Sequence, residues 1–174
     1  MKAKASLFLL LAATWLAAGT AAAKEVVRVP APAGVLPIVI TEGTLGNTGN
    51  AYSDFDRLDM AFRAVAKERN WPVKTVAERF ASGTPDYLTE LRISLFPRVN
   101  QEVPGEYFYR AWTTLWIDGK EYNFKVITAS YSYRMGENMD DVMEKVFRKG
   151  ANATADKIES LLFPDLPKPE KGKK

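Results

Sequence analysis

FYRAWTTLWIDGKEYNFKV, residues 108–126, is the stretch that decides the fold. Two runs rich in aromatic and β-branched residues flank Asp118-Gly119, a dipeptide that favours the two-residue type I′ turn of β-hairpins. A two-residue turn fixes the register of the strands that it joins. The predicted pairs are Ile117 with Lys120, Trp116 with Glu121, Leu115 with Tyr122, Thr113 with Phe124, Trp112 with Lys125 and Ala111 with Val126.

Side chains alternate between the two faces of a strand, so this register predicts which residues share a face. One face is predicted to be an ordinary core face, holding Tyr109, Ala111, Leu115, Ile117, Tyr122, Phe124 and Val126. The other is predicted to hold Phe108, Arg110, Trp112, Trp116, Glu121, Asn123, Lys125 and Ile127, with Tyr131 and Tyr133 further along. Large exposed apolar patches are rare on monomers. Either the N-terminal segment Val26–Val29 or the loop at 98–105 folds over this second face, or the face binds something.

Two further strands are expected around the hairpin. Residues 34–41 are predicted to form the first, with Pro37 placing it at an edge or a bulge. Residues 87–97 alternate apolar and polar side chains, which predicts a strand with Glu90 and Arg92 on its polar side.

Two amphipathic helices are predicted at residues 53–70 and 138–164. Ser53 and Asn138 are their expected N-caps. Gly150 is expected to mark a kink in the second helix or a close approach to the sheet.

Residues 71–86 fit either a short helix or a strand, and a strand is favoured because it would lead into the next one. The predicted fold is therefore α+β: a two-layer sandwich with a mostly antiparallel sheet and both helices packed on one face. This arrangement would leave the face that carries Trp112 and Trp116 open.

The first residues have the features of a secretory signal peptide. Lys2 and Lys4 precede an apolar run that is too short to span a bilayer, and Ala21-Ala22-Ala23 forms a cleavage signal. We expect cleavage after Ala23, followed by an extended segment at 24–33, a single α+β domain at 34–163 and a disordered basic tail at 164–174. The mature product is expected to be secreted, soluble, periplasmic and without a transmembrane segment.

Composition excludes several kinds of chemistry. The chain has no cysteine and no histidine, which rules out disulfides, thiol catalysis, Ser-His-Asp triads and the commonest zinc ligand sets. Without Lys2 and Lys4, 22 basic residues face 21 acidic ones, so no basic face points to nucleic acid. We expect no catalytic residues, no cofactor and no bound metal.

Three motifs are tempting but have simpler interpretations. The loop Gly43-Thr-Leu-Gly46-Asn-Thr-Gly49 follows a strand, but its glycine spacing and following residues do not match phosphate-binding loops. Two acidic clusters lie in the predicted first turns of helices, where the helix dipole alone favours acids. Asn152-Ala-Thr154 matches a glycosylation acceptor but lies within a predicted helix.

The predicted open face is the candidate interaction surface. It combines flat apolar rings with groups that can form hydrogen bonds, a composition shared by protein interfaces and carbohydrate platforms. Trp112 and Trp116 would lie about 13–14 Å apart on one strand, with Lys125 stacked on Trp112. The candidate residues are Arg92, Phe108, Arg110, Trp112, Trp116, Asn123 and Lys125.

The order of elements resembles that of small envelope α+β domains. The stretches that carry the resemblance are the helix FDRLDMAFRAVA (55–66), the strand PDYLTELRI (85–93), the hairpin WTTLWIDGKEYNF (112–124) and the helix end IESLLFP (158–164). Across residues 35–163 they look like the LPS-assembly lipoprotein family and the N-terminal domain of the Tol-system propeller protein. The resemblance implies a binding or assembly role rather than catalysis. The missing lipidated cysteine departs from the lipoprotein pattern.

The preferred hypothesis is therefore a non-catalytic envelope protein that binds another envelope component, a protein or a glycan, through its open sheet face. Glycan binding by Trp112 and Trp116 is the first alternative, and a hydrolase that uses carboxylates is the second. A homo-oligomer is compatible with the same surface.

Overall fold

The computed structural model describes residues 27–42, 51–78, 83–96 and 105–166. The predicted signal peptide, the Gly43–Gly49 loop and most of the predicted tail lie outside these ranges. The elements within them are β1 (Val35–Glu42), α1 (Ala51–Glu68), β2 (Lys74–Glu78), β3 (Thr89–Leu95), β4 (Glu106–Ile117), β5 (Lys120–Ser132) and α2 (Met139–Leu162).

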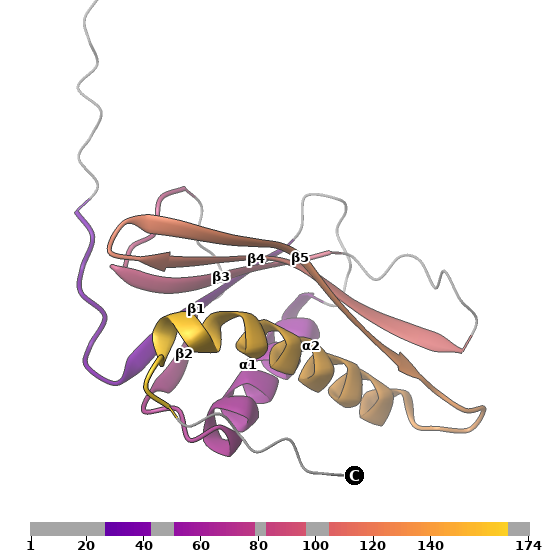
Figure 1. The fold of residues 1–174 in the computed structure, drawn as a ribbon. Helices are drawn as coiled ribbons and strands as arrows, with labels where there is room; N and C mark the ends of the chain where they lie inside the picture. The colour runs from indigo at the N-terminus through magenta and orange to yellow at the C-terminus, as the bar shows by residue number, and fades with distance from the viewer. Residues whose placement is uncertain (1–26, 43–50, 79–82, 97–104, 167–174) are drawn as a thin grey trace, which may run out of the picture.

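The structure is a two-layer α+β sandwich, which confirms the predicted fold class (Figure 1). Five strands form one open sheet in the order β2-β1-β3-β4-β5, and both helices lie on one side of it. The long β3–β4–β5 part is antiparallel, whereas β1 runs parallel to both of its neighbours. The strand favoured at 71–86 is present as β2.

The strand β1 is interior, so the predicted edge position of Pro37 is wrong. Pro37 pairs with Val76 of β2, and the pairing of β1 with β3 begins one residue later, at Ile38. Pro37, which has no backbone N–H, therefore lies just before the residues of β1 that pair with β3.

The helices bury the faces that their periodicity predicts. Leu58, Phe62 and Val65 of α1 are completely buried, and they form one core with residues of the sheet and α2. The core residues of α2 with the least exposure are Val142, Val146, Ala151, Ala155 and Ile158. Within the described residues, neither helix carries an apolar run that could cross a membrane.

The helix ends agree with the sequence in part. The side chain of Asn138 accepts a hydrogen bond from the backbone of Asp140, which confirms it as the N-cap of α2. The helix α1 begins at Ala51, so the prediction of Ser53 as its N-cap is wrong. Asn70, with φ of 51°, ends α1 in the left-handed region that closes helices.

Candidate functional site

The face of the sheet opposite the helices exposes two large apolar side chains beside each other. Trp112 of β4 and Val126 of β5 are direct partners across the hairpin, and they are 41% and 44% exposed. Direct partners in an antiparallel pair project from the same face of the sheet. This pair is the centre of the candidate surface.

A β-bulge produces this pairing and corrects the predicted register. The turn is as predicted, and pairs run correctly from Ile117 with Lys120 to Leu115 with Tyr122. The register then shifts between Trp112 and Thr114, so that Trp112 faces Val126 rather than Lys125. Lys125 itself has φ of 59°, the left-handed conformation found in some bulges.

The bulge exchanges the faces of the residues that follow it. Val126 was predicted in the core and is exposed, whereas Ile127 was predicted on the open face and is 5% exposed. Tyr131 also turns to the helix side, where Lys145 of α2 donates a hydrogen bond of 3.0 Å to its hydroxyl. Tyr133 packs on Tyr107, with ring centroids 5.7 Å apart.

Trp116 is half-buried because the N-terminal segment lies over it. The guanidinium of Arg28 stands 5.4 Å from the centre of the Trp116 ring. Val29, the next residue, forms an isolated parallel bridge with Tyr87 and exchanges backbone hydrogen bonds with Asp86 and Leu88. Of the two tryptophans predicted on the open face, Trp112 is therefore the more exposed.

Arg92 lies on the predicted face, but its guanidinium binds residues 83–84 of the same chain rather than facing solvent. Its Nε donates to the carboxylate of Glu90, and its Nη2 donates to the carbonyl of Thr84 at 3.0 Å. Glu90 was predicted on the polar side of β3, yet it is completely buried. Its second oxygen accepts the backbone N–H groups of Asp86 (2.9 Å) and Tyr87 (3.2 Å).

The burial of Glu90 has a tertiary cause. Residues 83–88 fold back over the start of β3, and the Glu90–Arg92 pair fixes them by hydrogen bonds to their backbone. The β3 part of the predicted surface is therefore covered by the protein's own chain, and the candidate surface is limited to β4 and β5.

The remaining predicted residues line this narrower surface. The guanidinium of Arg110 lies 5.5 Å from the ring centre of Phe108, and both side chains are half-buried. Asn123 and Lys125 are exposed, and the side chain of Asn123 accepts the backbone N–H of Lys125 at 2.7 Å. That hydrogen bond satisfies the backbone group that the bulge leaves without a ladder partner.

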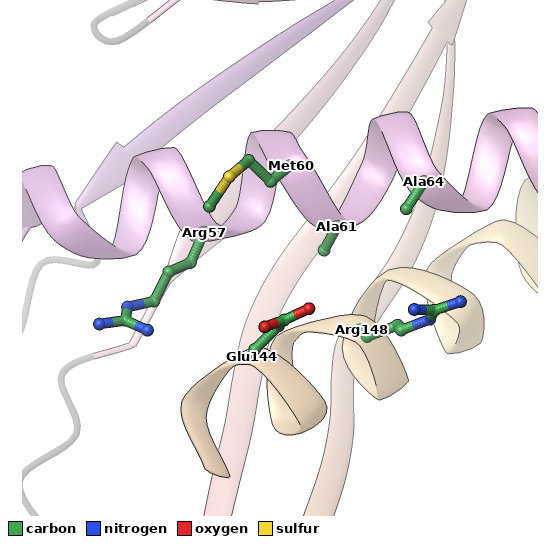
Figure 2. Close-up of a pocket in the computed structure, with 6 residues that line it drawn as sticks. All are labelled: Arg57, Met60, Ala61, Ala64, Glu144 and Arg148. Atoms are coloured by element: carbon green, nitrogen blue, oxygen red, sulfur yellow. The ribbon is translucent and has the colours of Figure 1, made fainter. Parts of the chain in front are cut away.

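A concave feature lies between the two helices (Figure 2). Ala61 and Ala64 of α1 leave a gap of about 160 Å³ against α2, with Arg57, Met60, Glu144 and Arg148 around it. Both arginines are ion-paired: Arg57 with Asp140 at 2.6 Å and Arg148 with Glu68. Small-molecule sites usually enclose about 300–1,000 Å³, so this gap is a shallow notch in helix packing.

Two acidic residues near the starts of the helices are ion-paired with arginines. Asp59 pairs with Arg63 at 2.9 Å, and Asp140 pairs with Arg57. Within the described ranges, no group of three or more acidic side chains is arranged to hold a metal ion. Asn152 and Thr154 both lie within α2. The side chain of Asn152 accepts a hydrogen bond of 3.1 Å from Arg69, and Thr154 is completely buried, so this glycosylation motif is not in an accessible loop.

Comparison with known proteins finds similarity in solved structures alone. No protein-family model matches the chain, and no curated protein matches it. A minor lipoprotein from Acinetobacter baumannii aligns at 16% identity and a TM-score of 0.38, over 72% of this chain and 93% of that one. Rare lipoprotein B from Shewanella oneidensis aligns at 16% identity and a TM-score of 0.35, over 72% of this chain and 95% of that one.

An uncharacterized protein aligns at 10% identity and a TM-score of 0.40, over 74% of this chain and 92% of that one. At TM-scores below 0.5 we draw no functional conclusion from these likenesses. Two of these three similar structures are lipoproteins, the class of protein that the sequence resembles.

Proposed function

We propose that this chain is a secreted, non-catalytic binding protein of the cell envelope, and that it holds another envelope protein against the open face of its sheet. The observation that carries the proposal is the Trp112–Val126 pair, exposed side by side on the face that neither helix covers. The signal-peptide features of residues 1–23 support a location beyond the inner membrane.

The surroundings of the pair suit a protein partner. Tryptophan and arginine are enriched among the residues that dominate binding energy at protein interfaces. Trp112 and Val126 supply the apolar centre, while Arg110 and Asn123 supply hydrogen-bonding groups around it. An apolar centre with a polar rim is the usual anatomy of such interfaces.

Glycan binding is less well supported by the same geometry. A sugar platform of two indoles would need both Trp112 and Trp116, but Arg28 lies over the second ring. The hydrolase alternative lacks paired acids at the interhelical notch, which is lined by one carboxylate, that of Glu144.

In-cell photocrosslinking from position 112 tests the proposal. We expect one discrete envelope protein to be captured, and we expect Trp112→Ser to reduce its co-purification while leaving the melting temperature near that of the parent. The matched control is Met60→Ser, because Met60 is 61% exposed on α1, away from the sheet.

Equal co-purification with Trp112→Ser and Met60→Ser would overturn the proposal. So would a fall in melting temperature typical of a core substitution, because the Trp112 ring would then belong to the core. Retention of the parent on peptidoglycan that is lost with Trp112→Ser would favour the glycan alternative.

A further inference from the structure

The strand β5 lies at the edge of the sheet, and its backbone shows which groups face outward. The N–H of Phe96 donates to the carbonyl of Arg110, so the backbone groups of Arg110 point toward the β3 side of β4. Its partner across the hairpin, Thr128, therefore points its own backbone groups away from β4. By alternation, the outward residues after the bulge are Val126, Thr128, Ser130 and Ser132.

The residues of the second half of β5 include none of the devices that usually protect an edge strand within its own sequence. Edge strands normally carry charges, prolines or bulges that discourage further pairing. The first half of β5 has these devices in Lys120, Glu121 and the bulge at Lys125. The second half, VITASYS at residues 126–132, has no charge, proline or glycine and is rich in residues that favour strands.

Cationic side chains surround this uncharged edge. Lys149 of α2 donates 3.0 Å to the outward carbonyl of Ser130 and lies 5.3 Å from the ring centre of Tyr131. Lys145 lies beside it on the same ring. The exposed Lys125 and Arg134 stand near the two ends of the segment.

Two carboxylates lie nearby, and both are engaged. Glu137 accepts from the backbone of Arg134 at 2.9 Å, and that hydrogen bond, with the Lys145 charge, lowers its pKa below the ordinary value. Glu106 accepts from the hydroxyl of Ser132 at 3.1 Å. The four cations named above therefore outnumber these two carboxylates.

We infer that the outer edge of β5 from Val126 to Ser132 takes an acidic, extended segment of the partner protein as a sixth strand. An incoming N–H would replace Lys149 at the carbonyl of Ser130, which would leave the ammonium to pair with a carboxylate of the partner. Addition of a strand to an open edge is a common mode of peptide recognition, in which the backbone supplies affinity and side chains supply specificity.

The charge pattern disfavours a second copy of this chain as the occupant. Antiparallel pairing of two β5 edges about Ala129 would bring the Lys149 side chains of both copies toward one another. Like charges facing each other across an interface oppose association. An acidic strand meets the same lysines with complementary charge.

The inference rests on the proposed function because it takes the ligand to be a segment of the partner protein. Its test does not depend on Trp112. The probe is a synthetic peptide that alternates glutamate with valine and threonine, blocked at both ends and fluorescently labelled. We expect it to bind the parent protein and to shift the amide resonances of Val126, Thr128, Ser130 and Ser132. A peptide with lysine in place of glutamate should not bind.

Two variants and one matched control sharpen the result. Thr128→Pro removes an outward N–H at a position where an edge strand accepts proline, and it should abolish binding without unfolding the protein. Lys149→Glu should weaken binding by about tenfold or more. Lys157→Glu makes the same charge change at an exposed site further along α2 and should have little effect.

Binding of the peptide by Thr128→Pro as strong as by the parent, or no binding by the parent, would overturn the inference. A dimer of the free parent that Thr128→Pro dissociates would also overturn it, because a second copy would then occupy the edge. Peptide binding that survives Trp112→Ser would support edge addition even if the proposed role of Trp112 failed.

Discussion

The ring of Tyr109 occupies the space where a side chain at position 150 would begin. A Cβ atom placed on Gly150 would come within 2.4 Å of two ring carbons of Tyr109, a distance that real contacts do not reach. The absence of a side chain at Gly150 therefore lets α2 lie directly on β4, and Phe147 packs edge-on against the same ring with centroids 5.8 Å apart.

Gly150→Ala should destabilise the protein. Alanine is better than glycine within a helix by about 1 kcal/mol, but forcing an extra methyl group into a packed core costs roughly 1–3 kcal/mol. We expect a net loss of up to about 2 kcal/mol in the free energy of unfolding, measured by urea denaturation. In a Tyr109→Ala background the same substitution should be neutral or stabilising, and equal losses in both backgrounds would contradict the proposed clash.

Tyr109→Phe should preserve stability at neutral pH and improve it in alkali. The Tyr109 hydroxyl is buried without a hydrogen-bond partner among the described residues, and the nearby Thr154 hydroxyl donates to the Gly150 carbonyl at 2.9 Å. Burial raises the pKa of Tyr109 above its ordinary value of 10.0. A raised pKa means that the folded state holds its proton longer than the unfolded state.

The contribution of Tyr109 to stability is therefore complete below pH 10 and is lost as the pH rises further. Thermal denaturation between pH 8 and pH 11 should show the advantage of Tyr109→Phe growing only above about pH 10. Tyr122→Phe, at a half-exposed tyrosine, is the control for the loss of a phenol hydroxyl outside the core. A constant difference across the range would contradict the assignment.

Arg92→Met should destabilise the protein strongly. It would leave the fully buried carboxylate of Glu90 without its cation, and it would release the carbonyls of Gly83 and Thr84. Breaking one side of a buried ion pair typically costs about 3–5 kcal/mol. Arg63→Met removes an exposed partner of Asp59 and should cost at most about 1 kcal/mol in the same denaturation measurement.

Arg28→Ala should open the Trp116 ring with little effect on stability. Exposed cation–π contacts are worth about 0.5–1 kcal/mol, so the melting temperature should change slightly. In a mature chain where Trp116 is the single tryptophan, acrylamide should quench its fluorescence more efficiently after the substitution. Unchanged quenching would show that Arg28 does not shield this ring in solution.

The sequence carries enough information for the elements and the turn of the hairpin. Asp118-Gly119 determines local backbone geometry, and the helix periodicity around Phe62 and Phe147 reflects burial that each helix shows on its own. These are short-range signals. They lead to the correct sandwich and to a correct register as far as Leu115 and Tyr122.

The features that the sequence did not predict depend on contacts between residues distant in the chain. No glycine marks the bulge at Lys125, so the alternation of residues 120–132 appears regular in the sequence. Glu90 looks like a solvent-side residue of β3 until residues 83–88 fold over it. Arg28 reaches Trp116 from far along the chain, and nothing local to either residue signals that contact.

Lys125 is in effect a spare residue within its strand. Phe124 packs toward the helices, Val126 points toward solvent and Ile127 packs toward the helices again. Without Lys125, side chains would therefore alternate regularly between the two faces of the sheet. Deleting that one residue would straighten the ladder while every other side chain kept its side. Deleting Thr128 instead would turn the remainder of the strand inside out.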